Sequence, residues 1–282
     1  MNISPVIDAI LNSRLVLDDG INAATYIVNP FGIKTYTSVA WVAISALNTN
    51  GLTGLFLTNL ASLTTLEIYS CGVLSDLTVD NTALLNLNLD DPTEFNNLIL
   101  TGNTGLKYLN LESLHHTDSG LTITNNTAMT TLVVTVLDYV NGTLDLSGNS
   151  ALPGLSFPAL TTWSGDADFT GCTLLASVSM PVLIGNSAGG PGNTLDMSGL
   201  SALTAFTIPA VWPFVDSFTV DLSGCALTQA AVDAILASAL ASSPAIATST
   251  IILTGGTNSA PSGAGIANAV LLNAAGNTVT HN

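Results

Sequence analysis

The sequence predicts a mainly β solenoid, in which the chain winds into stacked coils of about 22–23 residues. Two observations predict this fold class: an apolar-x-apolar triplet recurs about every eleven residues, and few stretches between triplets have helical spacing. Each coil then carries two extended segments on opposite flanks. The triplets are Leu55–Leu57, Leu66–Ile68, Leu77–Val79, Leu87–Leu89, Leu98–Leu100, Leu109–Leu111, Leu121–Ile123, Leu132–Val134 and Leu144–Leu146, with less regular repeats as far as Leu253.

Several triplets are followed by an Asn or Cys three residues after their last apolar residue, namely Cys71, Asn103, Asn126, Asn149, Cys172 and Cys225. This form, L-x-L-x-x-[N/C], resembles the leucine-rich repeat family over roughly residues 52–256. The resemblance implies short parallel strands with inward leucines, and an Asn or Cys that packs under the turn and bonds neighbouring backbone. The chain departs from the family because the triplet occurs twice per coil. A two-sided β-solenoid is therefore the nearest alternative fold.

The three cysteines, Cys71, Cys172 and Cys225, are odd in number and far apart in the sequence. A disulfide framework is therefore not expected. All three occupy the Asn/Cys position of the repeat. We expect each of them to have a structural role rather than to act in catalysis or metal binding.

Sorting the triplets by flank predicts two columns of outward-facing residues. The first column tends to be followed by Ser-Gly or Thr-Gly, where glycine permits a left-handed turn as the chain leaves the strand. Its members are Phe56, Thr78, Ile99, Thr122, Asp145, Asp168, Asp196, Asp221 and Ile252. The second column consists of Glu67, Asn88, Asn110, Val133, Ser156, Ser179 and Thr207.

The repeat divides the chain into three parts, which are residues 1–50, the solenoid proper over 51–225, and residues 226–282. In the first part, Ser4 and Pro5 predict the start of a short helix that runs to about Asn12. The β-branched and aromatic stretch from Thr25 to Leu47 predicts strands. We expect this part to cap the first coil or, alternatively, to anchor the chain to a larger assembly.

The last part of the sequence predicts a closing unit of helices and strands. Apolar residues at helical spacing predict a helix from Thr228 to Leu240, with Thr228 as its N-cap. A strand at Ile251–Leu253, a second helix from Ser262 to about Ala275 and a short strand at Thr278–Thr280 follow. We expect this unit to cover the last hydrophobic face of the array. Its sequence is loosely similar to that of uncharacterised phage and bacterial repeat proteins.

The charge balance excludes several classes of partner. The 282 residues include three Lys or Arg against 19 Asp or Glu, which gives a net charge of −16. Without a basic stripe, the chain is not expected to bind nucleic acid or to dock on anionic lipid. No apolar run has the length of a membrane helix, and Pro5, Asp8 and the late Arg14 do not fit a signal peptide.

The candidate metal ligands are the aspartates of the first column, Asp145, Asp168, Asp196 and Asp221. Stacked at the strand spacing of about 4.8 Å, their carboxylates would repel one another. One interpretation is a ladder that binds Ca²⁺, and the other is a solvated ladder that keeps neighbouring molecules from pairing. No other cofactor is expected. His115 and His116 offer metal-ligating types near Glu112 and Asp118, but adjacent residues on a turn rarely converge on one ion.

The candidate binding surface lies in two lengthened coils. One is lengthened by a Gly-rich run that contains Gly189, Gly190 and Asn193, and insertions of this kind often carry binding in solenoids. The other contains Trp212 and Phe214, whose exposure at a tip would suit contact with sugar or protein. The alternatives are a tolerated surface loop and an aromatic pair buried against the helix that follows.

No catalytic constellation, phosphate loop or zinc spacing is found in the sequence, so we expect a protein that is not an enzyme. The leading hypothesis is a structural protein of a bacteriophage virion, in capsid decoration, a head fibre or the tail. Its partners would be other virion proteins and host glycans or receptors. The alternative is a bacterial leucine-rich-repeat-like adhesin on the cell surface or outside the cell. A polysaccharide-acting enzyme that uses Asp145 and Asp168 is the remote alternative.

Overall fold

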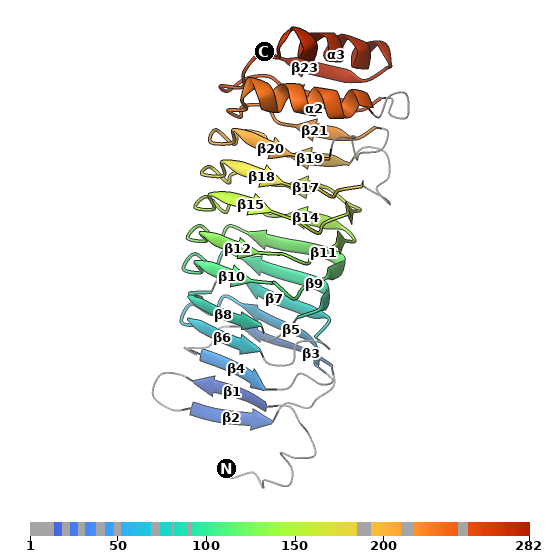
Figure 1. Ribbon diagram of the computed structural model, residues 1–282. Coiled ribbons are helices and arrows are strands. Elements are labelled where there is room, and N and C mark those ends of the chain that lie inside the picture. The colour runs from blue at the N-terminus through green and yellow to red at the C-terminus, as the bar shows by residue number, and fades with distance from the viewer. Residues whose placement is uncertain are drawn as a thin grey trace.

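The computed structural model describes residues 54–68, 74–80, 82–89, 92–184, 193–209, 217–241 and 248–282, and the backbone of 14–18, 23–27, 32–37, 43–47 and 52–53. These residues form an elongated stack of coils, with β1 and β2 near one end and α3 and β23 at the other (Figure 1). Equivalent residues of successive central coils are 23 residues apart, as Asn103, Asn126 and Asn149 show. The prediction of a mainly β solenoid with coils of this length is confirmed.

One flank of the stack is a continuous parallel sheet that runs along most of its length (Figure 1). Its strands follow chain order, because each coil adds one strand at the same edge. They are β3 (Gly32–Thr37), β5 (Leu52–Thr58), β7 (Asp76–Asp80), β9 (Glu94–Thr101), β11 (His116–Thr124), β14 (Thr143–Asp145), β17 (Ala167–Asp168), β19 (Thr194–Asp196), β21 (Thr219–Asp221), β22 (Thr250–Leu253) and β23 (Thr278–His281). Two short strands, β13 (Tyr139–Val140) and β16 (Thr162–Trp163), extend it beside β11.

The opposite flank is divided into three shorter sheets. These are β2 (Ala23–Ile27), β1 (Arg14–Asp18), β4 (Ala43–Leu47), β6 (Thr65–Ile68) and β8 (Asn86–Leu89), then β10 (Tyr108–Asn110) with β12 (Thr131–Val133), then β15 (Gly154–Ser156), β18 (Ser177–Ser179) and β20 (Ala205–Thr207). Strand β1 pairs antiparallel with both β2 and β4, whereas the later pairs on this flank are parallel. The chain therefore starts this flank with a reversal before regular winding begins.

The core lies between the two flanks and is filled by the inward residues of the triplets. Strand β7, for example, alternates buried and half-buried side chains, and its Leu77 and Val79 are fully buried. This alternation is the one that a strand with a single covered face produces. The nine outward residues predicted for the first column are neighbours in register from Phe56 to Ile252, which confirms that column.

A column of buried polar side chains joins successive coils just after the long sheet. The backbone N–H of Asn103 donates to Oδ1 of Asn126 at 3.0 Å, and the N–H of Asn126 donates to Oδ1 of Asn149 at 3.0 Å. The side-chain amide of Asn126 donates in turn to the carbonyl of Leu100 at 2.9 Å. Each asparagine thus satisfies backbone groups that the turn leaves without a strand partner.

Cysteine replaces asparagine in this column at two positions. The Cys172 thiol donates to the carbonyl of Leu146 at 3.2 Å, and the Cys225 thiol donates to that of Met197 at 3.1 Å. Both are buried free thiols. Burial raises the pKa of Cys172 to about 11 and that of Cys225 to about 12, with smaller contributions from nearby aspartates. They remain protonated near neutral pH, as a structural role requires.

The third cysteine, Cys71, follows in the sequence a triplet that lies on the other flank of the solenoid. The triplet Leu66–Ile68 that precedes it forms β6, which pairs with β4 and β8 on the opposite flank. Cys71 itself lies outside the described residues. On the long-sheet flank of this coil, the residue that follows β7 at the equivalent position is Thr82, whose hydroxyl donates to Oδ1 of Asn103 at 2.6 Å.

The predicted helices and strands of the last part are confirmed. Helix α2 spans Gln229–Ala241, and the hydroxyl of Thr228 accepts from the N–H of Ala231 at 3.3 Å. Helix α3 spans Gly263–Ala274 with Ser262 as its N-cap, and β23 closes the long sheet. Neither helix is long and apolar enough to cross a membrane, and the described residues contain no other candidate. The helix expected after Ser4 lies outside the described residues.

Candidate functional site

The predicted aspartate column lies in register on the long sheet, where Asp145 neighbours Asp168, Asp168 neighbours Asp196, and Asp196 neighbours Asp221. All four side chains are half-buried. Oδ1 of each accepts a hydrogen bond from the N–H two residues later, at 3.0 Å for Asp145 and 2.8 Å for the other three. Each carboxylate therefore helps to form the turn that ends its own strand.

This geometry bears directly on the Ca²⁺ hypothesis. The aspartates come from successive coils, and one oxygen of each is already bound to its own turn. Within the part of the chain that the structure describes, no three His, Cys, Asp or Glu residues are grouped so that they could hold a metal ion. Ca²⁺ prefers six or more oxygen ligands, so a ladder alone supplies a poor site. Both interpretations of the column stay predictions, and these contacts favour the solvated ladder over the Ca²⁺ ladder.

Of the residues predicted to form a binding surface, Asn193 lies within the described structure. Its side-chain amide donates to the carbonyl of Ser164 at 3.0 Å, and its carbonyl accepts from the N–H of Thr219 at 2.9 Å. Asn193 is half-buried and ties the lengthened coil to the coil before it. Gly189, Gly190, Trp212 and Phe214 lie outside the described residues.

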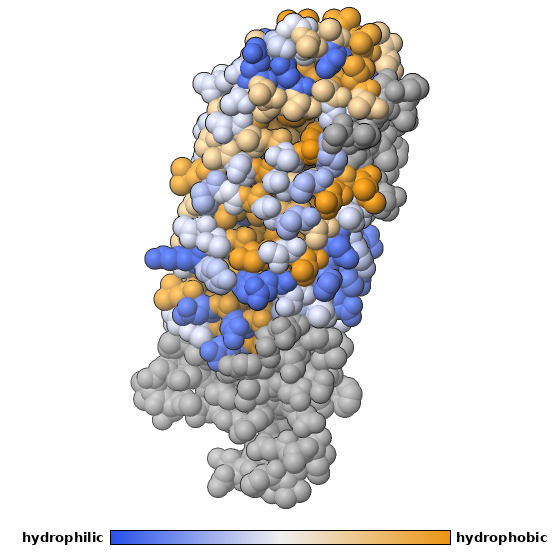
Figure 2. Space-filling view, in the orientation of Figure 1, coloured by the Kyte–Doolittle hydropathy of each residue, from blue (hydrophilic) through white to orange (hydrophobic). Residues whose placement is uncertain are grey.

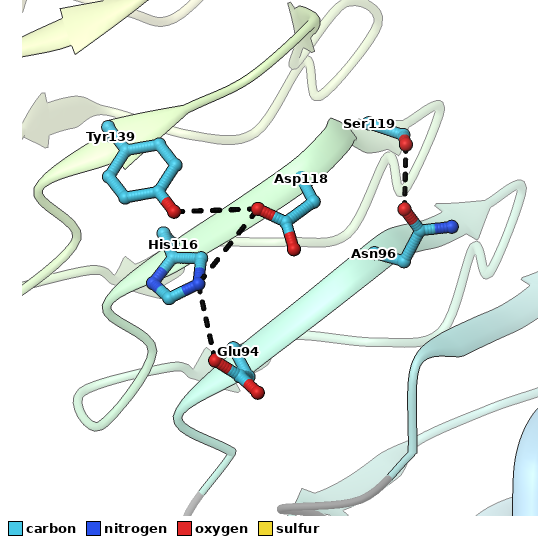
Figure 3. Close-up of polar contacts among 6 residues, drawn as sticks. All are labelled: Glu94, Asn96, His116, Asp118, Ser119 and Tyr139. Atoms are coloured by element: carbon cyan, nitrogen blue, oxygen red, sulfur yellow. Dashed lines mark hydrogen bonds and ion pairs between the residues drawn. The ribbon is translucent and has the colours of Figure 1, made fainter.

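The structure brings together a cluster of polar and aromatic side chains that the sequence analysis did not assemble (Figure 3). Glu94, at the start of β9, is the in-register neighbour of His116 on β11, and His116 neighbours Tyr139 on β13. Nε2 of His116 lies 3.3 Å from Oε2 of Glu94 and 4.0 Å from Oδ1 of Asp118. We call Glu94, His116, Asp118 and Tyr139 the edge cluster.

The two rings of the edge cluster are stacked. The centroids of His116 and Tyr139 are 4.5 Å apart and their planes differ by 9°. The hydroxyl of Tyr139 donates to Oδ1 of Asp118 at 3.4 Å. Partial burial raises the pKa of Tyr139 above its ordinary value, and the Asp118 carboxylate raises it further. The phenol therefore keeps its proton near neutral pH and remains a donor.

A β-bulge positions Asp118 at this site. The pairing of β11 with β9 shifts between Thr117 and Gly120, so that Asp118 and Ser119 stand opposite the single residue Asn96. Both bulge side chains are exposed, and the hydroxyl of Ser119 donates to Oδ1 of Asn96 at 2.7 Å (Figure 3). Bulges commonly redirect a side chain in this way. In this conformation Asp118 lies within 4.0 Å of His116 and accepts from the hydroxyl of Tyr139.

The polar edge continues beyond the cluster. The side-chain amides of Asn96 and Asn97 both donate to Oδ1 of Asp76 at 2.9 Å, and the hydroxyl of Ser164 donates to Oδ1 of Asn141 at 2.8 Å. Beside Tyr139, Oδ1 of Asp138 is buried without a hydrogen-bond partner. Among the described residues no donor reaches this buried oxygen.

The two neighbouring histidines have different surroundings. His116 is 22% exposed and contacts Glu94 and Asp118, whereas His115 is exposed and uses its backbone to bond the neighbouring coils. Its N–H donates to the carbonyl of Thr93 at 2.9 Å. Asp118 was expected near the pair, but Glu94 comes from the coil before. Only the register of β9 and β11 identifies that partner.

The edge cluster presents polar and aromatic side chains that a ligand can contact. It combines two exposed carboxylates, a stacked aromatic pair and a protonated phenol, and no Ser, Cys or Lys nucleophile is among the residues that form it. Its geometry suits a polar ligand that supplies hydrogen-bond donors. Comparison with known proteins finds no matching family model, no similar curated protein and no similar solved structure.

Proposed function

We propose that this chain is a non-enzymatic structural protein that acts through its repeat surface, as a component of a bacteriophage virion. The observation that carries the proposal is that its outward polar residues form hydrogen bonds within the solenoid itself. The aspartates of the first column each bond the turn of their own coil, and Asn141 and Asn193 bond neighbouring coils. Such residues maintain an elongated shape and leave little chemistry for turnover.

The composition supports a place on an exposed particle. Three Lys or Arg in 282 residues leave few cleavage sites for trypsin-like proteases, and the net charge of −16 keeps particles apart. Capsid decoration, a head fibre and a tail-associated protein all fit an elongated solenoid. A leucine-rich-repeat-like bacterial adhesin is the alternative that shares these traits.

Mass spectrometry and cryo-electron microscopy of purified particles from the source culture test this proposal. A virion component is present at a fixed copy number per particle, and the solenoid is visible as a rod-like density. Its absence from particles, combined with recovery from cell envelopes or free medium, would instead establish the adhesin. Antibody labelling of intact cells distinguishes these two locations.

Adhesion to host glycans is the second function that a specific observation favours. The edge cluster presents the stacked His116 and Tyr139 beside the exposed Glu94 and Asp118. Sugar hydroxyls donate hydrogen bonds that such carboxylates accept. Binding of the full chain to a glycan array tests it. We expect Tyr139→Ala to remove the signal and Tyr108→Ala to retain it, because Tyr108 is 53% exposed on the opposite flank. An equal loss for both variants would exclude the edge cluster.

The polysaccharide-acting enzyme is disfavoured by the same contacts. Asp145 and Asp168, its candidate pair, each accept a hydrogen bond from their own turn and stand one strand apart on the sheet. Both carboxylates are therefore already used in the turns of their own coils.

A further inference from the structure

The C-terminal end of the solenoid differs in charge from the rest of the chain. Asp233 is the last Asp, Glu, Lys or Arg in the sequence, so residues 234–282 carry no charged side chain apart from any charge on His281. The chain as a whole has a net charge of −16. A second copy that approaches most of the surface therefore meets like charge, whereas α3 itself has no acidic side chain and the nearest one, Asp233 on α2, accepts from the N–H of Ser262 at 2.9 Å.

The same end exposes large apolar side chains. On α3, Ile266, Val270 and Leu271 are 46%, 61% and 54% exposed. Figure 2 shows apolar side chains gathered at this end of the molecule, over the region of α2 and α3. Terminal units of solenoids usually carry a polar outer face, which keeps the array soluble. The predicted closing unit covers the coil below it but presents an apolar face of its own.

A comparison of the two helices explains this face. Counted from the first residue of each helix, Ile266 and Val270 of α3 stand where Val232 and Leu236 stand in α2. Val232 and Leu236 are fully buried, and α3 packs on α2. In the described structure no coil lies above α3, and Ile266 and Val270 are exposed there (Figure 1).

We propose that this face binds the same face of a second copy, so that two chains associate end to end through α3. A two-fold contact places each helix against its own equivalent, and the small exposed residues Ala264 and Ala267 leave room for the larger side chains of the partner. No charged side chain belongs to α3, so the repulsion that opposes this contact comes from the rest of each chain. The contact is independent of the proposed setting in a virion.

Two features favour a closed dimer over an open filament. The edge of β23 is partly blocked, because the N–H of Val279 already donates to Oδ1 of Asn273 at 2.8 Å. At the other end of the stack, β1 pairs antiparallel with β2 and β4, which does not repeat the parallel stacking of the C-terminal coils. A head-to-tail contact would therefore place the parallel C-terminal coil against an antiparallel pair of strands, and the strand pattern would not continue from one chain to the next.

The expected dimer is weak. Helix α3 has twelve residues, and its length of about 18 Å limits the contact to less than the roughly 800 Å² per partner of a standard interface. We expect sedimentation velocity of the full chain from about 1 to 200 µM to show a monomer–dimer equilibrium with a micromolar dissociation constant. Raising the salt concentration strengthens the dimer, because it screens the repulsion between the acidic chains.

Two matched variants complete the experiment. We expect Val270→Asp to weaken the dimer at least tenfold, and Leu174→Asp, at a site 58% exposed in the middle of the solenoid, to leave it unchanged. Circular dichroism melting confirms that both variants fold. Val270→Cys is expected to form a disulfide-linked dimer under oxidising conditions. A wild type that stays monomeric, forms species larger than a dimer, or dimerises equally well as Val270→Asp overturns the proposal.

Discussion

Two columns run along the long-sheet flank, the buried Asn/Cys column and the outward aspartate column, and they lie four residues apart in the sequence where a coil has both, at Asn149 and Asp145 for example. They bond in different directions. Asn149 accepts from the N–H of Asn126 in the coil before, whereas Asp145 accepts from the N–H of Ser147 in its own turn. The buried column therefore holds coils together, and the outward column shapes each turn separately. We therefore expect substitutions in the buried column to lower the free energy of unfolding more than substitutions in the outward column.

The largest expected effect comes from the centre of the buried column. We expect Asn126→Ala to lower the free energy of unfolding by about 2–4 kcal/mol, because the Asn103 N–H and the Leu100 carbonyl both lose their buried partner. Urea unfolding followed by circular dichroism measures it. Thr122→Ala, at an outward position of the same coil, is the control and should change stability by less than about 0.5 kcal/mol. Equal losses in the two variants would contradict the distinction between the columns.

The cysteines of the buried column predict a loss of stability at high pH. Their pKa values are raised to about 11 and about 12 by burial, so the folded state keeps thiols that the unfolded chain ionises near pH 9. The unfolded state releases protons first, and stability falls as pH rises from about 9 towards 12. We expect a loss of about 2 kcal/mol from Cys172 by pH 11.

Urea unfolding of wild type and Cys172→Ala at pH 8, 9.5 and 11 measures this loss. The variant should be less stable at pH 8 but lose less on going to pH 11. Parallel pH profiles for the two proteins would show that Cys172 does not ionise on unfolding as described. Iodoacetamide labelling at pH 8 adds a direct readout, since Cys172 and Cys225 should be protected in the folded state.

The outward column should give smaller changes whose sign depends on the substitution. Asp168→Ala removes the acceptor for the Thr170 N–H and is expected to cost about 1 kcal/mol. Asp168→Asn keeps an acceptor and removes a charge between Asp145 and Asp196, so it should gain a few tenths of a kcal/mol at low salt. Thermal melting at low and high salt separates the contribution of the hydrogen bond from that of the charge. An asparagine variant as unstable as the alanine variant would show that the charge itself is needed.

The smallest expected effect is that of Ca²⁺. Because each aspartate of the column already bonds its own turn, we expect millimolar Ca²⁺ to shift the melting temperature no more than Mg²⁺ at equal ionic strength. Isothermal titration calorimetry gives the direct measurement. Saturable heat that disappears in Asp168→Asn would establish a cation ladder and make the outward column a functional site.

Much of the fold was predictable because its signals are local. The spacing of the triplets predicted the coils and the first outward column, and helical spacing with Thr228 and Ser262 as caps predicted α2 and α3. The period alone does not show which flank a triplet belongs to. The triplet Leu66–Ile68 that precedes Cys71 has the same form as those of the long sheet, yet it forms β6 on the opposite flank.

The edge cluster was not predictable in the same way. Glu94, His116 and Tyr139 lie about 22 residues apart and outside the triplets, and a bulge at Asp118 and Ser119 completes the site. Inserting or deleting one residue in any of these coils would shift the register and bring other side chains together. The signal that the sequence did contain was the pair of metal-ligating types at His116 and Asp118, but it gave no indication of Glu94.

The sequence by itself determined the period, the inward leucines and the low positive charge, because these depend on neighbouring residues or on composition alone. The tertiary structure decided which outward side chains meet and which apolar residues stay uncovered. Val232 and Ile266 occupy matching positions of similar helices, yet one is fully buried and the other is 46% exposed. The physical reason is that burial in a solenoid depends on the neighbouring coils, and the described structure places no coil above α3 (Figure 1).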